Sequence, residues 1–217
     1  MVRKKLRAIL FGPQGCGKGT QGQLLSERYD VPFIGAGDLF RDEIEAKSPL
    51  GNLLSSYVNQ GLLAPDEVVD AVIAQRLKKH DLSHGFLLDG YPRNVVQATH
   101  LQRLLDVNLA IYIKISDAES IRRLTGRLQC RRCKATYHTT EAPPVVPGIC
   151  SICGGKLTPR EDDQEEAIRK RLATFHFMTE PMATFFRQHG VLLTVNGEQP
   201  IAYVFEELTR KMVKLGF

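Results

Sequence analysis

The segment from Gly12 to Thr20 contains the residue types that bind phosphate groups. It reads Gly-Pro-Gln-Gly-Cys-Gly-Lys-Gly-Thr. Glycines adopt backbone torsions that are closed to other residues, so the main chain can approach a bound anion closely. Successive backbone N–H groups and a helix N-terminus would then face the phosphates, and Lys18 adds a positive charge. The pattern predicts a phosphate-binding loop if a strand precedes it and a helix follows it.

Four of the five cysteines form two Cys-x-x-Cys pairs, Cys130 with Cys133 and Cys150 with Cys153. This spacing is typical of a zinc ribbon, in which four thiolates fill a tetrahedral shell and leave no open position. We therefore expect a structural Zn²⁺, although iron or cobalt would fit the same ligands. Two alternatives are a segment that has lost its metal and a ribbon that binds nucleic acid. The fifth cysteine, Cys16, is expected to be a packing residue and not a nucleophile.

The chain has 217 residues, which is enough for one buried core with small insertions. Its net charge of +5 indicates either a nucleic-acid partner or a site for phosphates. We favour the phosphate site and expect no nucleic acid, because the arginines lie in separate motifs and not in one basic run. Apolar runs are too short to span a bilayer and no signal cleavage site follows the N-terminus, so we expect a cytoplasmic protein without a membrane partner.

Apolar runs alternate with helical segments along the chain, which predicts an α/β fold with a parallel sheet. Strands are expected at 6–11, 86–88, 109–113 and 191–195. Helices are expected at 18–29, after a capping box of Ser116 and Glu119, over 163–188, and from Pro200 toward Leu215. The first strand and helix flank the Gly-rich loop, as a phosphate-binding loop requires. Asp89 follows the second strand, at the edge where such sheets bind ligands.

Two segments interrupt this alternation. Residues 35–64 indicate short helices with no strand between them, and residues 126–163 contain the paired cysteines and several prolines. We interpret both as insertions into a core formed by residues 1–34, 65–125 and 164–217.

Several motifs resemble the adenylate kinase family. Gly-Lys-Gly-Thr-Gln at 17–21 resembles its phosphate loop, whereas most GTPases place Ser or Thr directly after the lysine. Gly-Asp-Leu-Phe-Arg at 37–41 resembles its monophosphate motif, and the stretch at 85–93 resembles a further family motif with Tyr91 in place of Phe. Residues 162–171 resemble the segment after the lid. The resemblance therefore extends from about residue 6 to the C-terminus.

The resemblance implies a P-loop NTPase-like parallel sheet flanked by helices, with 35–64 as the monophosphate-binding insertion and 126–163 as a zinc-binding lid. It implies reversible transfer of the γ-phosphoryl group of Mg-ATP to AMP, giving two ADP, by a monomer. Phosphoryl transfer depends on positioning and electrostatics, and arginine grips phosphate oxygens bidentately. The implied catalytic residues are Lys18, Asp89, Arg93, Arg123, Arg160 and Arg171, with Asp89 holding water on Mg²⁺.

Binding residues follow from the same resemblance. Those implied for ATP are Gly15, Cys16, Gly17, Lys18, Gly19, Thr20, Arg123, Arg127, Thr136, Tyr137 and Gln199. Those implied for AMP are Ala36, Arg41, Leu62, Leu63, Ala64, Gly90, Tyr91, Pro92, Arg93, Gln97, Arg160 and Arg171. Long-lid adenylate kinases of the zinc type have cysteines at the places of Cys130, Cys133, Cys150 and Cys153.

The identity of the monophosphate depends on a few residues. Gln97 corresponds to the glutamine that reads adenine in adenylate kinases, since an amide pairs bidentately with that base. Ala36 and Asn94 instead resemble UMP/CMP kinases, so a UMP/CMP-type or broad-specificity nucleoside monophosphate kinase is an alternative. The long lid favours adenylate kinase, because UMP/CMP kinases of this type have short lids.

Two other classes of protein are less favoured. One is a non-catalytic module that senses nucleotide and uses its zinc ribbon for binding; arginines for an acceptor site argue against it. The other is a GTPase, and the sequence has no Asn-Lys-x-Asp guanine motif.

Overall fold

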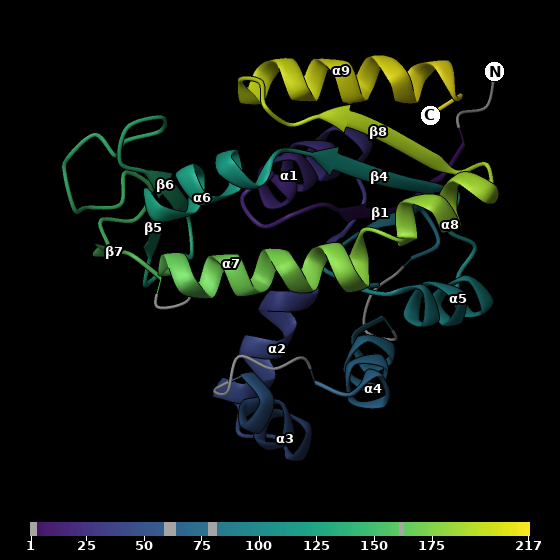
Figure 1. Ribbon diagram of the computed structural model, residues 1–217, viewed down its shortest axis with the longest axis horizontal. Coiled ribbons are helices and arrows are strands. Elements are labelled where there is room, and N and C mark those ends of the chain that lie inside the picture. Colours follow the sequence, from purple (N-terminus) through teal and green to yellow (C-terminus); the bar gives the residue numbers. More distant parts are fainter. Residues whose placement is uncertain (1–3, 59–63, 78–81, 161–162) are drawn as a thin grey trace.

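The computed structural model describes residues 4–58, 64–77, 82–160 and 163–217. Helices cover both faces of a five-stranded sheet, and a small three-stranded sheet lies at one end of the molecule (Figure 1). Among the described residues, no helix is long and apolar enough to cross a lipid bilayer.

The large sheet is parallel throughout and has the strand order β2-β3-β1-β4-β8. Its strands are β1 (Leu6–Phe11), β2 (Phe33–Gly35), β3 (Gly85–Asp89), β4 (Leu109–Lys114) and β8 (Leu192–Asn196). The predicted α/β class is confirmed, as are the four predicted strands, whose ends differ by at most one residue. The strand β2 is not among the predicted ones, because three residues are too few to show a period.

Alternate side chains of β1 enter two separate hydrophobic clusters, one on each face of the sheet. Ile9 and Phe11 join the cluster that contains residues of α2 (Ala36–Glu45), α4 (Asp66–Leu77), α5 (Val95–Leu104) and α8 (Met182–Gln188). Ala8 and Leu10 join the cluster with α1 (Lys18–Tyr29) and α9 (Ile201–Lys214). Burial on both faces explains why these strands are continuous apolar runs and do not alternate with polar residues.

The described part of 35–64 contains two short helices with no strand between them, as the sequence predicted. Its helices α2 and α3 (Pro49–Val58) extend away from the sheet, and α3 lies farthest from it (Figure 1). Leu54 of α3 is fully buried and belongs to the same cluster as Leu39 of α2. The segment therefore packs through apolar side chains between its own helices. Its role as an insertion that binds a ligand stays a prediction.

The prediction of one continuous helix over 163–188 is wrong. The structure has α7 (Glu165–Thr174), a π-helix (Phe175–Thr179) and α8. Pro181 has no backbone N–H and cannot continue an α-helical hydrogen-bond ladder. The Glu180 N–H instead donates to the Phe175 carbonyl, 2.9 Å away, which is the wider spacing of a π-helix.

The capping box predicted for α6 (Asp117–Thr125) is only half formed. The Ser116 hydroxyl accepts a hydrogen bond from the Glu119 N–H at 3.3 Å, as predicted. For the reciprocal bond, the Ser116 N–H donates to the Glu198 carboxylate, 2.6 Å away, and not to Glu119. Glu119 is engaged elsewhere, because its carboxylate pairs with Arg122 and Arg123.

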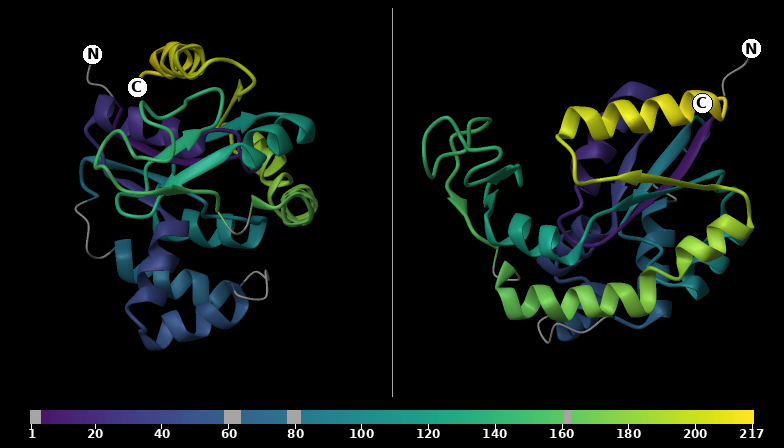
Figure 2. Two further views of the ribbon diagram at one scale, coloured as in Figure 1. Left: turned by 90° about the vertical axis from the view of Figure 1, so that its left-hand side faces the viewer. Right: turned by 45° about the horizontal axis from the view of Figure 1, so that its top comes forward.

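The small sheet contains β5 (Arg127–Cys130), β6 (Thr136–His138) and β7 (Leu157–Thr158), paired antiparallel in the order β6-β5-β7. It joins the large unit through α6 and the segment before α7, and lies beyond the ends of these two helices (Figure 2). Its buried cluster consists of Cys130, Cys150 and Leu157. A core of this size needs an additional source of stability.

Truncation of Phe186 to alanine is expected to lower the free energy of unfolding by about 3–5 kcal/mol. The Phe186 side chain is fully buried, and its ring lies 6.1 Å from that of Phe11. Phe177→Ala is the matched control, because Phe177 is 81% exposed and its loss should change stability by less than about 0.5 kcal/mol. Urea unfolding of both variants measures the difference; equal losses would contradict this account of the core.

Candidate functional site

The Gly-rich loop connects β1 to α1, which is the context that the phosphate-loop prediction requires. Gly17, with φ 92°, stands in the left-handed region directly before α1. A Cβ on Gly12 would lie 2.3 Å from the Ile113 carbonyl oxygen, so the loop can pass this strand only with glycine there. A Cβ on Gly19 would meet no described atom within 4 Å. The start of α1 therefore faces open space that a phosphate group can enter.

Lys18 is folded back over its own loop. Its Nζ donates to the carbonyl oxygens of Gly12 and Pro13, at 2.8 and 2.9 Å. The Cys16 Sγ lies 3.4 Å from the same Nζ. Burial raises the pKa of the Cys16 thiol despite the nearby ammonium group. Cys16 is thus held as a neutral thiol in the apolar cluster below the loop.

Arg123 of α6 bridges the phosphate loop and the turn after β8. Its guanidinium group donates to the Gly15 carbonyl at 3.4 Å and to the Gly197 carbonyl at 2.9 Å, and it pairs with Glu119 at 2.6 Å. Hydrogen bonds from Arg122 and Arg123 lower the pKa of Glu119 to about 2. Gln199 follows the same turn, where its amide donates to the Asn196 carbonyl at 3.0 Å. The structure thereby brings three of the residues predicted for ATP, Gly15, Arg123 and Gln199, to one region.

Asp163 binds two of the predicted arginines and is not among the predicted site residues. Its carboxylate forms two hydrogen bonds with Arg127, at 2.6 and 2.7 Å, and a weaker one with Arg171 at 3.4 Å. The Asp163 side chain is only 3% exposed. Its place in the motif at 162–165 was the sequence feature that could have identified Asp163 as a site residue. Asp162 of the same motif lies outside the described residues.

Arg93 lies in a cluster of positive charge beyond the end of β3. Its Nε donates to the Gly90 carbonyl at 2.9 Å, and the ring of Phe40 lies 6.0 Å from its guanidinium carbon. Burial lowers the pKa of Arg93; Arg171 and Arg41 lower it further, and Asp89 opposes them. Three arginines predicted for AMP therefore lie near one another and near Asp89. Such a cluster of positive charge suits a ligand with several negative charges.

The chain between β3 and α5 shapes the surroundings of this cluster. The peptide bond between Tyr91 and Pro92 is cis. The Tyr91 hydroxyl, which the family motif lacks, donates to the Asp70 carboxylate at 2.7 Å, and burial raises its pKa. A Cβ on Gly90 would lie 3.8 Å from that of Ala36, which is buried at the start of α2. Ala64 is partly buried and packs on the neighbouring core, whereas Leu62 and Leu63 lie outside the described residues.

Gln97 and Asn94 lie at the start of α5 and both contact Asp66. The Gln97 Nε2 donates to Asp66 at 2.6 Å, and its Oε1 accepts from the Arg93 N–H at 2.7 Å. The Asn94 Oδ1 accepts from the Gln97 N–H at 2.8 Å, so Asn94 is the N-cap of α5. The asparagine that resembles UMP/CMP kinases is therefore explained by helix capping.

Thr136 and Tyr137, predicted to lie against ATP, are both in β6. The Tyr137 hydroxyl lies 3.4 Å from the Cys150 Sγ and accepts from the Ser151 N–H at 3.0 Å. Its side chain thus faces the cysteines, so a contact with ATP would come from its main chain. Thr136 is exposed. Arg160 follows β7, and its carbonyl accepts from the Asp163 N–H at 3.2 Å.

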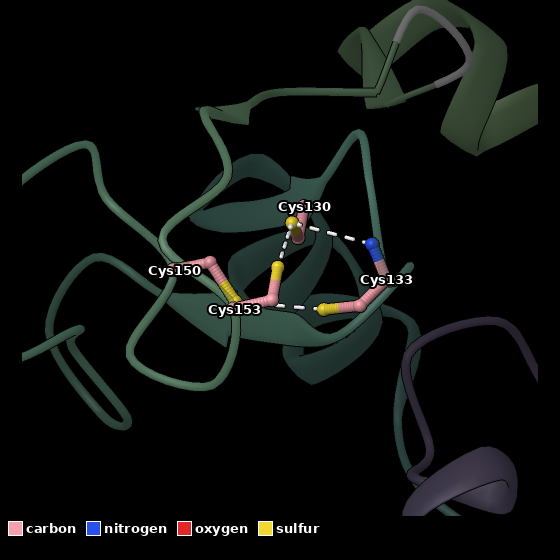
Figure 3. Close-up of side chains that lie close together, drawn as sticks. All are labelled: Cys130, Cys133, Cys150 and Cys153. Atoms are coloured by element: carbon pink, nitrogen blue, oxygen red, sulfur yellow. Dashed lines mark hydrogen bonds between the residues drawn. The ribbon is translucent and has the colours of Figure 1, made fainter.

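The four paired cysteines converge beside the end of β5 (Figure 3), and their sulfur atoms all lie within 4.8 Å of one another. Cys130 and Cys153 are 3.5 Å apart at sulfur, as are Cys133 and Cys150. A tetrahedral site with Zn–S bonds of about 2.3 Å has sulfurs about 3.8 Å apart, so this set has the right size and ligand type.

Polar groups around the cysteines affect how easily they ionise. Backbone N–H groups of Cys133 and Arg132 donate to the Cys130 sulfur and lower its pKa. The Tyr137 hydroxyl lowers the pKa of Cys150 to about 6. A backbone hydrogen bond from Ala135 favours the Cys133 thiolate, but the neighbouring thiols raise its pKa to about 12. Because a metal needs four thiolates, its binding would release protons.

Comparison with known proteins identifies similar chains of nearly equal length. A family model described as adenylate kinase matches residues 10–191. An adenylate kinase of Desulfitobacterium hafniense (strain DSM 10664 / DCB-2) is 43% identical over 212 residues, covering 95% of this chain and 98% of the relative. Adenylate kinases of Caldicellulosiruptor bescii and Methanosarcina barkeri are 37% and 40% identical, covering 95% and 96% of this chain and 99% of each relative.

Replacement of Asp163 by asparagine is expected to lower the free energy of unfolding by about 2 kcal/mol, because two arginines lose a shared carboxylate that is almost fully buried. Glu165→Gln is the matched control. Its pair with Arg169 is exposed on both sides and should contribute less than about 0.5 kcal/mol. Urea unfolding compares the two variants, and a loss for D163N no larger than that for E165Q would contradict this role.

Proposed function

The chain belongs to the adenylate kinase family, and we propose that it catalyses the reversible transfer of the γ-phosphoryl group of Mg-ATP to AMP, forming two ADP. The observation that carries this proposal is the cluster of Arg41, Arg93 and Arg171 near Asp89. A nucleotide sensor needs only the phosphate loop. A second group of arginines, placed for a second phosphate, is what an acceptor requires.

On the donor side, we assign the ATP phosphates to the loop between β1 and α1. Gly15, Cys16, Gly17, Gly19 and Thr20 would present their backbone N–H groups, as at other helix N-termini that bind phosphate. Lys18 would exchange the carbonyl oxygens of Gly12 and Pro13 for phosphate oxygens. Arg123 already lies over the loop, and Arg127 would approach the phosphates with the small sheet that carries it.

On the acceptor side, Arg41, Arg93, Arg160 and Arg171 would hold the AMP phosphate and neutralise the charge that moves during transfer. Arg171 lies close to Arg93 and also contacts Asp163, so it links the acceptor cluster to Arg127. Gln97 would read the adenine. The remaining residues assigned to the AMP site are Ala36, Leu62, Leu63, Ala64, Gly90, Tyr91 and Pro92.

Carboxylate oxygen is a ligand type that suits Mg²⁺ and its bound waters, and Asp89 offers it at the end of β3. Burial raises the pKa of Cys16 and the charge of Asp89 raises it further, so Asp89 lies close enough to the phosphate loop to act on that thiol. When bound, Mg²⁺ neutralises charge on the ATP phosphates. Asp89 would keep one of its waters in place and would balance the charge of Arg93.

The four cysteines would hold a structural Zn²⁺. Because they fill a tetrahedral shell, the metal has no position for a substrate and serves stability alone. Cys130 and Cys150 are also members of the only buried cluster that the described part of the small sheet has, so the metal would replace an apolar core. With this support, residues 126–163 would close over ATP as a rigid lid while 35–64 close over AMP, which excludes water from the transfer.

The purified chain, supplied with Mg-ATP, is expected to convert AMP much faster than GMP, CMP or UMP. Arg93→Ala should lower kcat by about 10²–10³-fold, because it removes a partly buried charge from the transferring phosphate. Arg103→Ala, on the exposed side of α5, is the matched control and should retain wild-type turnover. A coupled assay of ADP formation measures all of these rates.

Either of two results would contradict the assignment. Near-wild-type turnover by R93A would remove Arg93 from the acceptor site. Comparable turnover of CMP or UMP would make the chain a broader monophosphate kinase, in which Ala36 has opened the base site.

The protein isolated from zinc-supplemented medium is expected to contain one Zn²⁺ per chain, as measured by mass spectrometry of the metal. Cys150→Ser should lose most of that metal and unfold the small sheet at lower temperature, while the large sheet stays folded. Cys16→Ser is the control, because Cys16 lies in the phosphate loop, and it should retain the full metal content. Zinc content unaffected by C150S would exclude the four-cysteine site.

A further inference from the structure

The Gln97 amide lies between two groups of opposite hydrogen-bonding character. Its Oε1 accepts from the Arg93 backbone N–H at 2.7 Å, and its Nε2 donates to an Asp66 carboxylate oxygen at 2.6 Å. A backbone N–H can only donate, and an ionised carboxylate can only accept. These two neighbours therefore allow a single orientation of the amide. Rotation by 180° would set N–H against N–H and oxygen against oxygen.

Asp66 is itself held in place from two directions. The Asn94 Nδ2 lies 3.1 Å from each of its carboxylate oxygens, and Asn94 is fixed in turn as the N-cap of α5. Asp66 is also the first residue of α4, where the helix dipole stabilises a negative charge. The starts of α4 and α5 are thus joined by a closed set of hydrogen bonds among Asp66, Asn94 and Gln97. Such a set cannot turn its amide groups without losing several bonds together.

The fixed amide keeps one hydrogen-bonding position on each of its two atoms. Oε1 has a second lone pair, and Nε2 has a second hydrogen. On its Watson–Crick edge, adenine presents an amino donor and a ring-nitrogen acceptor. Guanine presents an acceptor and a donor in the reversed places. For a base held in one position, an amide that cannot rotate therefore pairs with one of the two purines, whereas a freely rotating amide pairs with either.

We propose that Asp66 determines purine specificity, acting as a positioning residue that locks the Gln97 amide in the orientation that accepts adenine and rejects guanine. This inference rests on the proposed function, since it takes Gln97 as the residue that reads the base. Ala36 strengthens the dependence on this lock, because alanine contributes no hydroxyl to the site.

The test compares Asp66→Asn with Glu67→Gln in the wild-type chain. Both substitutions remove one carboxylate charge from the first turn of α4, but Glu67 is exposed and is not part of the lock. Asparagine can present either an oxygen or an amino group to Gln97, so both orientations of the glutamine amide become accessible. For each variant, kcat and KM are measured with AMP and with GMP at saturating Mg-ATP.

D66N is expected to reduce the ratio of kcat/KM for AMP over GMP about tenfold, which corresponds to the loss of one charge-assisted hydrogen bond. The change should appear in KM for AMP and GMP, with kcat for AMP and KM for ATP nearly unchanged. E67Q should keep the wild-type ratio. A wild-type ratio in D66N overturns the proposal, as does an equal fall in E67Q.

A further comparison tests whether Asp66 acts through Gln97. In a Gln97→Ala background, D66N should leave the AMP-to-GMP ratio unchanged, because there is no amide to orient. The same fall in both backgrounds would overturn the proposal. If D66N does not fold, Asn94→Ser provides the second variant. Serine keeps the helix cap but removes the donor to Asp66, so the ratio should fall in the same direction and less.

Calorimetric binding of AMP and GMP separates this inference from the proposed function. A chain that binds both nucleotides but transfers no phosphoryl group contradicts the proposed kinase activity. The ratio of the affinities for AMP and GMP, measured in D66N and in E67Q, then tests the role of Asp66 by the same criterion. A ratio that falls only in D66N supports the lock, and one that stays constant overturns it.

Discussion

The structure depends on keeping several guanidinium groups close together before any phosphate arrives. Burial lowers the pKa of Arg93, and the charges of Arg171 and Arg41 repel its guanidinium group and lower that pKa further. Carboxylates at fixed places offset this repulsion: Asp163 holds Arg127 and Arg171, Glu119 holds Arg123, and Asp89 faces Arg93. Each carboxylate belongs to a different segment of the chain. The fold therefore brings arginines and the carboxylates that pair with them to one region, which suits the binding of a polyanion.

The parallel sheet explains why these segments meet. In a parallel sheet all carboxyl ends lie along one edge, and ligands bind there. β1 leads into the phosphate loop, β3 into Asp89 and the chain to Arg93, β4 into α6 with Arg123, and β8 into the turn at Gly197 that Arg123 contacts. Motifs that are far apart in sequence therefore lie at the same edge of the sheet. The apolar clusters on both faces hold the strands, so the edge can be polar and charged at little cost to the core.

The small sheet and the start of α4 follow a different principle, in which polar groups fix a geometry that apolar packing alone cannot. In the small sheet, four sulfur atoms occupy the position of a hydrophobic core. At α4, Asp66 orients Gln97 through groups that can only donate or only accept. Both arrangements have high specificity because an unsatisfied buried donor or acceptor costs about 1–3 kcal/mol. Both arrangements fix a local geometry with few residues.

The sequence by itself determined the features that local patterns encode. The phosphate loop, the α/β class, four strands of the parallel sheet and the helical segment at 35–64 were all predicted, because glycine spacing and apolar runs act within short windows. The spacing of the cysteines likewise predicted a set of four that the structure brings together. Other features depend on partners that are distant in sequence. Asp163 meets Arg127 across 36 positions, and Asp66 meets Gln97 across 31, so neither contact leaves a local pattern. The half-formed capping box was likewise decided by tertiary structure, because Glu198, 82 positions away, takes the place that the local pattern gives to Glu119.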